Sequence, residues 1–126
     1  MSLNVNITEE QAGIFTVTPS GSIDSETYFE LEKKLNPILN PSTKLIVFDM
    51  GEVAYISSMG LGVILKTKSF MEKNNASIII SNLQPQVEKV LDILKALPEH
   101  IFKSMEEVDA YITEIQRKEI EKRKSR

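Results

Sequence analysis

Short apolar runs alternate with longer amphipathic segments along this chain, which is the pattern of strands and helices in turn. Two β-prone runs, 5–9 and 14–18, are separated by a short polar stretch that ends in Gly13, and they predict a hairpin. Further apolar runs at 45–48 and 77–81 predict strands. Because the run at 45–48 is continuously apolar, we expect both of its faces to be covered, and we expect 77–81 to be another buried strand.

Three segments repeat apolar residues at roughly helical spacing: 24–39, 58–73 and 85–94. Residues 101–102 are interpreted as a short last strand. A final helix is indicated by Val108, Tyr111, Ile112 and Ile115. Strands that alternate with helices after an initial hairpin predict a single α/β domain, with a mixed β-sheet, helices packed on it and an extended C-terminal helix.

Length and composition narrow the class of protein. With 126 residues, one domain can bury an ordinary core without disulfides or metal. The absence of cysteine excludes disulfides, thiolate metal sites and cysteine catalysis. No run approaches the ~18 to 20 apolar residues that span a bilayer, and the N-terminus has no basic segment followed by an apolar one. We therefore expect a cytoplasmic protein without a membrane segment.

Charge is unevenly distributed along the chain. The net charge is −3, but residues 116–126 contain six Lys or Arg and two Glu, so this segment carries +4 and the remainder −7. An acidic body does not fit a nucleic-acid binder. We expect a domain over 1–115 and an exposed basic helical extension over 116–126, in which Ile120 is the sole apolar residue. This extension is either a solvated helix end or a contact for an acidic partner or a membrane surface.

The stretch 44–68 is chemically the most informative, since an apolar run leads through a short loop into two serines and a helix. Ser58 is predicted in the N-cap region of that helix. Free N–H groups and the positive end of the helix dipole favour a hydroxyl, a carboxylate or a phosphate there. A phosphate would add roughly −1.5 to −2 charges. The position therefore suits a switch as well as a plain cap.

Three parts of the sequence resemble one bacterial family. The segment from Asp49 through Tyr55, Ser57, Ser58 and the run GLGVIL at 60–65 resembles the phosphoacceptor region of anti-sigma factor antagonists, the single-domain STAS proteins. PSGSID at 19–24 is similar to the family's Gly-x-x-Asp turn. SIIISNLQPQVEKVLDIL at 77–94 is similar to its strand, Asn-containing loop and helix. The resemblance covers about 5–112.

The resemblance implies which residues form the site. Matched through Gly60, the acceptor serine is Ser58, whereas the aspartate that the family commonly places before it is Ser57 here, a second candidate hydroxyl. Asp24 either caps its own helix or positions the acceptor. The implied partner surface consists of Asp24, Tyr28, Ser57, Ser58, Met59, Gly60, Leu61 and Gly62.

The resemblance also implies a function without catalysis. In the unphosphorylated form, such a protein binds an anti-sigma factor that is also a serine kinase and so releases a sigma factor. The kinase, with its own ATP and Mg²⁺, phosphorylates Ser58, and a serine phosphatase resets the switch. The chain itself needs no cofactor or metal.

Two other functions remain open. One is a STAS accessory subunit of a transport or signalling assembly, without a phosphorylation cycle. The other is a small phosphate- or nucleotide-handling enzyme, which is disfavoured because the lone His100 is far from Ser58 in sequence and no base or metal cluster can be assembled. The glycines at 60 and 62 are not followed by the Lys-Ser or Lys-Thr of a phosphate-binding loop, so close packing of the helix against the sheet is the favoured interpretation of this pair.

Overall fold

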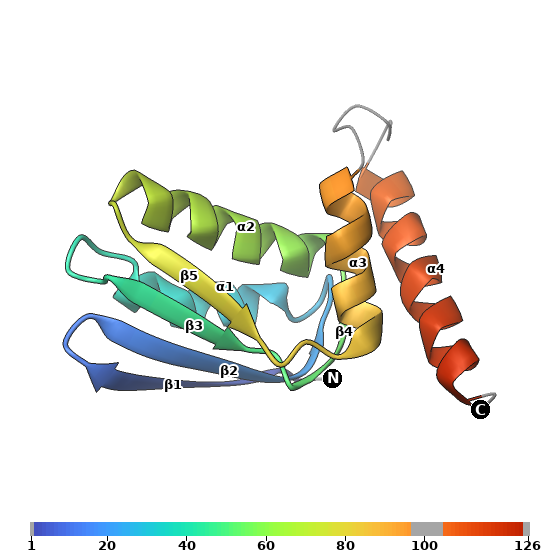
Figure 1. The fold of residues 1–126 in the computed structure, drawn as a ribbon, viewed down its shortest axis with the longest axis horizontal. Helices are drawn as coiled ribbons and strands as arrows, with labels where there is room; N and C mark the ends of the chain where they lie inside the picture. The colour runs from blue at the N-terminus through green and yellow to red at the C-terminus, as the bar shows by residue number, and fades with distance from the viewer. Residues whose placement is uncertain (1, 97–104, 125–126) are drawn as a thin grey trace.

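The computed structural model describes residues 2–96 and 105–124 (Figure 1). The elements, in chain order, are β1 (Asn4–Gln11), β2 (Ile14–Ile23), α1 (Tyr28–Leu35), the 3₁₀ helix η1 (Asn36–Ile38), β3 (Leu45–Asp49), β4 (Glu52–Ile56), α2 (Ser58–Lys73), β5 (Ser77–Ser81), α3 (Pro85–Ala96) and α4 (Met105–Lys124). After the first two strands, helices and strands follow one another as predicted, except that β4 comes directly after β3.

The sheet is mixed, which confirms the predicted fold class. Its strands follow the order β1-β2-β3-β5, with β1 and β2 antiparallel and the remaining pairs parallel. β2 is long enough to pair with two further strands on the same edge: residues 14–17 pair with β3, and residues 20–23 pair with β4. The predicted hairpin is confirmed. Its turn contains Gly13 at φ +82°, where a Cβ would lie 2.6 Å from the carbonyl oxygen of Ser42.

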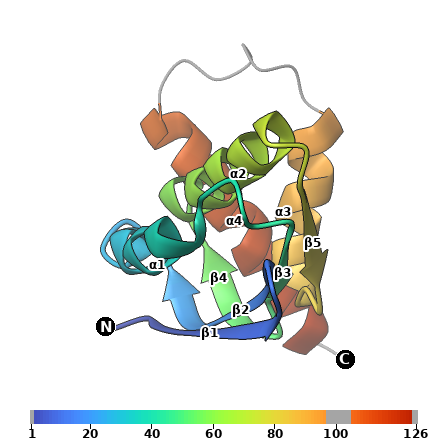
Figure 2. The ribbon, with the colours of Figure 1, turned by 90° about the vertical axis from the view of Figure 1, so that its left-hand side faces the viewer.

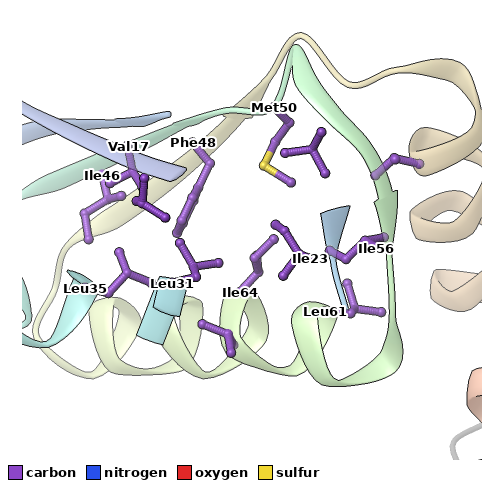
Figure 3. Close-up of a cluster of buried hydrophobic side chains, with 14 of the residues drawn as sticks. Val17, Ile23, Leu31, Leu35, Ile46, Phe48, Met50, Ile56, Leu61 and Ile64 are labelled. Atoms are coloured by element: carbon purple, nitrogen blue, oxygen red, sulfur yellow. The ribbon is translucent and has the colours of Figure 1, made fainter. Parts of the chain in front are cut away.

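The helices form two groups around the sheet. Figure 2 shows α1 and α2 side by side on one face, while α3 and α4 lie together at the end of the molecule near β4. The core lies between the sheet and the first pair of helices. Figure 3 shows its buried side chains, which include Val17, Ile46 and Phe48 from the strands and Leu31, Leu35 and Ile64 from the helices.

The other face of the sheet is more open than the sequence predicts. Ile46 and Phe48 are fully buried, but Leu45 and Val47 are only half-buried and Ile79 is 50% exposed. The predictions that both faces of 45–48 are covered and that 77–81 is a buried strand are therefore wrong. The apolar side chains of this face shield one another partly, because Val47 lies directly opposite Ile79 in the parallel pair.

Several element bounds depart from the prediction. The helix expected over 24–39 begins only at Tyr28, because the carboxylate of Asp24 accepts the N–H groups of Glu26 and Thr27 at 2.9 and 3.0 Å and closes a turn. The segment before α2 was expected to be a loop and contains β4. The strand predicted at 101–102 lies outside the described residues, as does His100.

α4 is one continuous helix from Met105 to Lys124. Ile112 and Gln116 are buried, whereas residues 117–124 are exposed except for the half-buried Glu119. The exposed part thus begins after Gln116, one residue later than expected. The separation into a domain over 1–115 and an extension over 116–126 stays a prediction.

Candidate functional site

The candidate site is the junction where β4 ends and α2 begins. Pairing with the end of β2 places Ile56 opposite Ile23, and the N–H of Ser57 donates to the carbonyl of Ile23 at 2.8 Å. In Figure 3, Ile23, Ile56 and Leu61 gather beneath this junction. The backbone of the junction is therefore held by the sheet on one side and the core on the other.

The two serines of the junction have different environments. Ser57 is extended, and its Oγ accepts the N–H of Gly60 at 3.2 Å, so Ser57 is the N-cap of α2. Ser58 is the first helical residue and is 8% exposed. The prediction of Ser58 in the N-cap region is thus corrected by one residue, because the capping hydroxyl belongs to Ser57.

Ser58 contacts a carboxylate that the sequence did not indicate. Its N–H and its hydroxyl both donate to Oδ1 of Asp109, at 3.0 and 3.2 Å. Asp109 comes from α4, 51 positions away in the chain. A negative charge at this end of α2 is favourable, since the helix dipole is positive there. A carboxylate, that of Asp109, therefore lies at the N-terminus of α2, although the position where the resemblance expects an aspartate holds Ser57.

α4 makes further hydrogen bonds to the same strand end. The side chain of Gln116 accepts the N–H of Ile56 at 2.9 Å and donates to its carbonyl at 2.8 Å. The hydroxyl groups of Thr113 and Tyr55 are 2.7 Å apart. Positions 109, 113 and 116 lie on one face of a helix, and this polar spacing is the only sequence signal for the contact.

Gly60 lies at the closest approach of α2 to β2. A Cβ there would be 2.5 Å from Cγ2 of Ile23 and 2.8 Å from its carbonyl oxygen, so no side chain fits. A Cβ at Gly62 would meet nothing within 4 Å. The interpretation of the glycine pair as close packing holds for Gly60 and is wrong for Gly62.

The remaining predicted residues lie around this junction. Asp24 directly follows Ile23, and its carboxylate accepts N–H groups of its own turn. Tyr28 starts α1 and is half-buried. Met59 is 39% exposed on the first turn of α2, and Leu61 is buried. The surface at the start of α2 is thus formed by Met59 and Gly62 more than by Leu61.

A family comparison identifies the domain. The model of the STAS domain matches residues 6–108. The chain belongs to the STAS domain family. Among the residues that the structure describes, no helix has the length and apolar character needed to cross a membrane.

Relatives of this STAS domain include named regulators. The anti-sigma-B factor antagonist of Staphylococcus aureus is 27% identical over 93 residues, which cover 74% of this chain and 85% of that protein. The phosphorylated form of SpoIIAA, a Bacillus cell fate determinant, shares the fold with a TM-score of 0.63 and 15% identity, over 72% of this chain and 83% of that one.

The fold also occurs inside a larger protein. The murine anion transporter Solute Carrier 26 family member A9 matches with a TM-score of 0.58 and 18% identity, over 80% of this chain and 16% of the transporter. At these identities, the solved structures establish the fold of this chain and not its partners.

Proposed function

We propose that this STAS domain is an anti-sigma factor antagonist that is switched by phosphorylation of Ser58. The observation that carries the proposal is the position of Ser58, on the first turn of α2 and two residues before the tightly packed Gly60. Support comes from the family match and from the relatives named as anti-sigma factor antagonists. In this role the protein works in the cytoplasm and has no catalytic activity of its own.

The partner is an anti-sigma factor with serine kinase activity. It transfers the γ-phosphoryl group of ATP to Oγ of Ser58: the Oγ–P bond forms, the bond from phosphorus to the oxygen bridging to ADP breaks, and the hydroxyl proton is released. Mg²⁺ on the kinase neutralises the phosphates. A serine phosphatase returns Ser58 to the hydroxyl form by hydrolysis.

Phosphorylation changes binding through charge. The unmodified protein presents Met59 and Gly62 beside a neutral hydroxyl, and this surface binds the kinase and frees the sigma factor. A phosphate adds roughly −1.5 to −2 charges to a contact from which water is excluded. The complex then dissociates. If the added charge makes binding less favourable by about 3 kcal/mol, the affinity for the kinase falls more than a hundredfold.

A second candidate is an accessory STAS module of a transport or signalling assembly, without a phosphorylation cycle. The fold match to a transporter domain and the serine at position 57 favour it. So does the small exposure of Ser58, 8%, in the unmodified protein.

Incubation of the full chain with MgATP and an anti-sigma factor that has serine kinase activity distinguishes the two candidate functions. We expect a single phosphate, located on Ser58 by peptide mapping, in the wild type and in Ser57→Ala, and none in Ser58→Ala. Phosphate on Ser57 would contradict the assignment of the acceptor. No incorporation, together with stable binding to a transporter subunit, would support the second candidate.

A further inference from the structure

The hydroxyl of Ser58 is not free in this structure. Ser58 is 8% exposed, and its Oγ donates to Asp109 on α4. A kinase must align this oxygen with the γ-phosphorus of ATP, with the attacking and leaving oxygens in line. To reach such an alignment, the hydroxyl must give up its hydrogen bond to Asp109.

α4 is attached to the junction by both polar and apolar contacts. Asp109 and Gln116 hydrogen-bond to Ser58 and Ile56, and between them Ile112 is fully buried. Each such hydrogen bond favours the attached state by about two- to tenfold net, or by about ten- to 150-fold where it is made to a charged group, because water satisfies the same groups after release. A modest change in charge at the junction can therefore shift the balance between attached and released α4.

Phosphorylation changes the charge at the position where α4 is attached. Oδ1 of Asp109 accepts both the N–H and the hydroxyl of Ser58. A phosphate on Oγ removes the hydroxyl donor and puts a dianion against the carboxylate. The phosphate also competes for the N–H groups of the first turn of α2, which suit an anion. All three effects act against Asp109.

We propose that α4 is part of the switch: Asp109 positions the hydroxyl of Ser58 in the unmodified protein, and phosphorylation of Ser58 expels Asp109 and releases α4 from the β4–α2 junction. The inference rests on the proposed function. It gives the phosphorylated state a different shape as well as a different charge, because release uncovers Ile56 and Ile112.

The amide of Ile56 reports the state of α4 without any kinase. Its N–H donates to Gln116, which is seven residues, or about 10 Å along the helix axis, from Asp109. Hydrogen exchange at this amide thus senses release of the helix and not just loss of the Asp109 contact. The amides of Val53 and Leu61, which donate to Met50 and Ser57 respectively, serve as internal controls.

Four variants test the role of charge: Ser58→Ala, Ser58→Asp, Asp109→Asn and the double variant Ser58→Asp with Asp109→Asn. We expect exchange at Ile56 to be about tenfold faster in Ser58→Asp than in Ser58→Ala, because two carboxylates then face each other. The double variant should return to within about twofold of Ser58→Ala, since an amide still accepts the N–H of residue 58. Equal rates at Ile56 in Ser58→Asp and Ser58→Ala would overturn the inference.

If Ser58→Asp unfolds, hydrogen exchange will be accelerated equally at Ile56 and at the control amide of Val53. A second pair of variants keeps the test valid in that case. Asp109→Ala removes the contact, and Glu114→Ala is its control, because Glu114 is an exposed acid on α4 that pairs with Arg117. We expect faster exchange at Ile56 and faster phosphorylation of Ser58 in Asp109→Ala alone. Wild-type rates at Ile56 in this variant would refute the attachment.

The kinase experiment separates this inference from the proposed function. A protein that the kinase phosphorylates, but whose Ile56 exchange is unchanged afterwards, would leave the function standing and overturn the release of α4. A protein that is never phosphorylated, but whose Ser58→Asp variant releases α4, would refute the function and keep the mechanical link between residues 58 and 109.

Discussion

At the scale of single residues, the two adjacent hydroxyls of the junction differ in what their removal should cost. Ser57→Ala removes the cap of Gly60 and should lower the free energy of unfolding by about 1 kcal/mol. Ser58→Ala keeps the backbone N–H donor to Asp109, so we expect a smaller loss. Urea unfolding of both variants measures the difference. A larger loss in Ser58→Ala would contradict the assignment of the cap.

The glycines of α2 form a matched pair for a second test. Gly60→Ala should be strongly destabilising, since its Cβ would overlap Ile23 of a strand that cannot move away. Gly62→Ala should be neutral or stabilising by up to about 1 kcal/mol, because alanine favours the helix and meets open space. Thermal unfolding should give a midpoint well below that of the wild type for Gly60→Ala and a midpoint at or above it for Gly62→Ala. A lowered midpoint in both would contradict the packing described for Gly62.

At the scale of elements, two glutamines satisfy the edge of β4 that faces α3 and α4. Gln86 donates to the carbonyl of Ala54 at 2.7 Å, and Gln116 bonds both backbone groups of Ile56. Gln116→Ala should therefore cost about 1 to 3 kcal/mol, the penalty for buried polar groups left without a partner. Lys118→Ala, an exposed position on the same helix, is the control. Equal unfolding midpoints in urea would show that water replaces Gln116 without cost.

Removal of the exposed end of α4 should have little effect on the free energy of unfolding. Arg117 bridges Glu114 and Glu121, and this hydrogen-bonded guanidinium lowers the pKa of the Glu114 carboxyl. A chain that ends after Glu121 keeps the bridge and should unfold like the wild type, within about 0.5 kcal/mol. A chain that ends after Gln116 should lose more unfolding free energy than the chain that ends after Glu121. Gln116 then lies in the terminal turn of α4, whose carbonyls have no intrahelical partners. Equal stability of the two truncations would show that the bridge and the last turns contribute nothing.

The elements also show how far the sequence alone leads. α2 and β5 have their predicted bounds, because each joins a strong apolar pattern to clear turn residues. β4 is not predictable from alternation, since an irregularity opposite Gly21 and Ser22 places an extra residue, Ala54, in the strand and breaks the period of two.

The residues of the candidate site also differ in how far the sequence predicts them. The helix start at Ser58 and the tight contact at Gly60 follow from a local pattern, whereas the cap is predictable only to within one residue, since Ser57 and Ser58 are both suitable capping residues. Asp109 does not follow from a local pattern, because its contact joins positions 51 residues apart and depends on how α4 packs. Side chains that reach the site from a distant element leave no comparable local signal.

At the scale of the whole molecule, two of the exposed apolar residues in the described part of the chain lie in different places. Met59 is 39% exposed on the first turn of α2, beside the junction, and Ile79 is 50% exposed on the open face of the sheet. Both are on regular elements, and both can be replaced by lysine without burying a charge. Replacing each of them in turn therefore distinguishes a contact at the partner surface from a general effect of losing an exposed apolar side chain.

We expect Met59→Lys to weaken binding of the anti-sigma factor kinase at least about tenfold, and Ile79→Lys to change it by less than about twofold. A lysine at residue 59 would bring a charge into the contact next to Ser58, whereas residue 79 lies on a strand at the end of the sheet order, where lysine is well tolerated. Titration calorimetry with the kinase measures both, and urea unfolding should show both variants within about 0.5 kcal/mol of the wild type. Stronger weakening by Ile79→Lys would place the partner on the open sheet face, and Ser58 would then act at a distance from the surface that it controls.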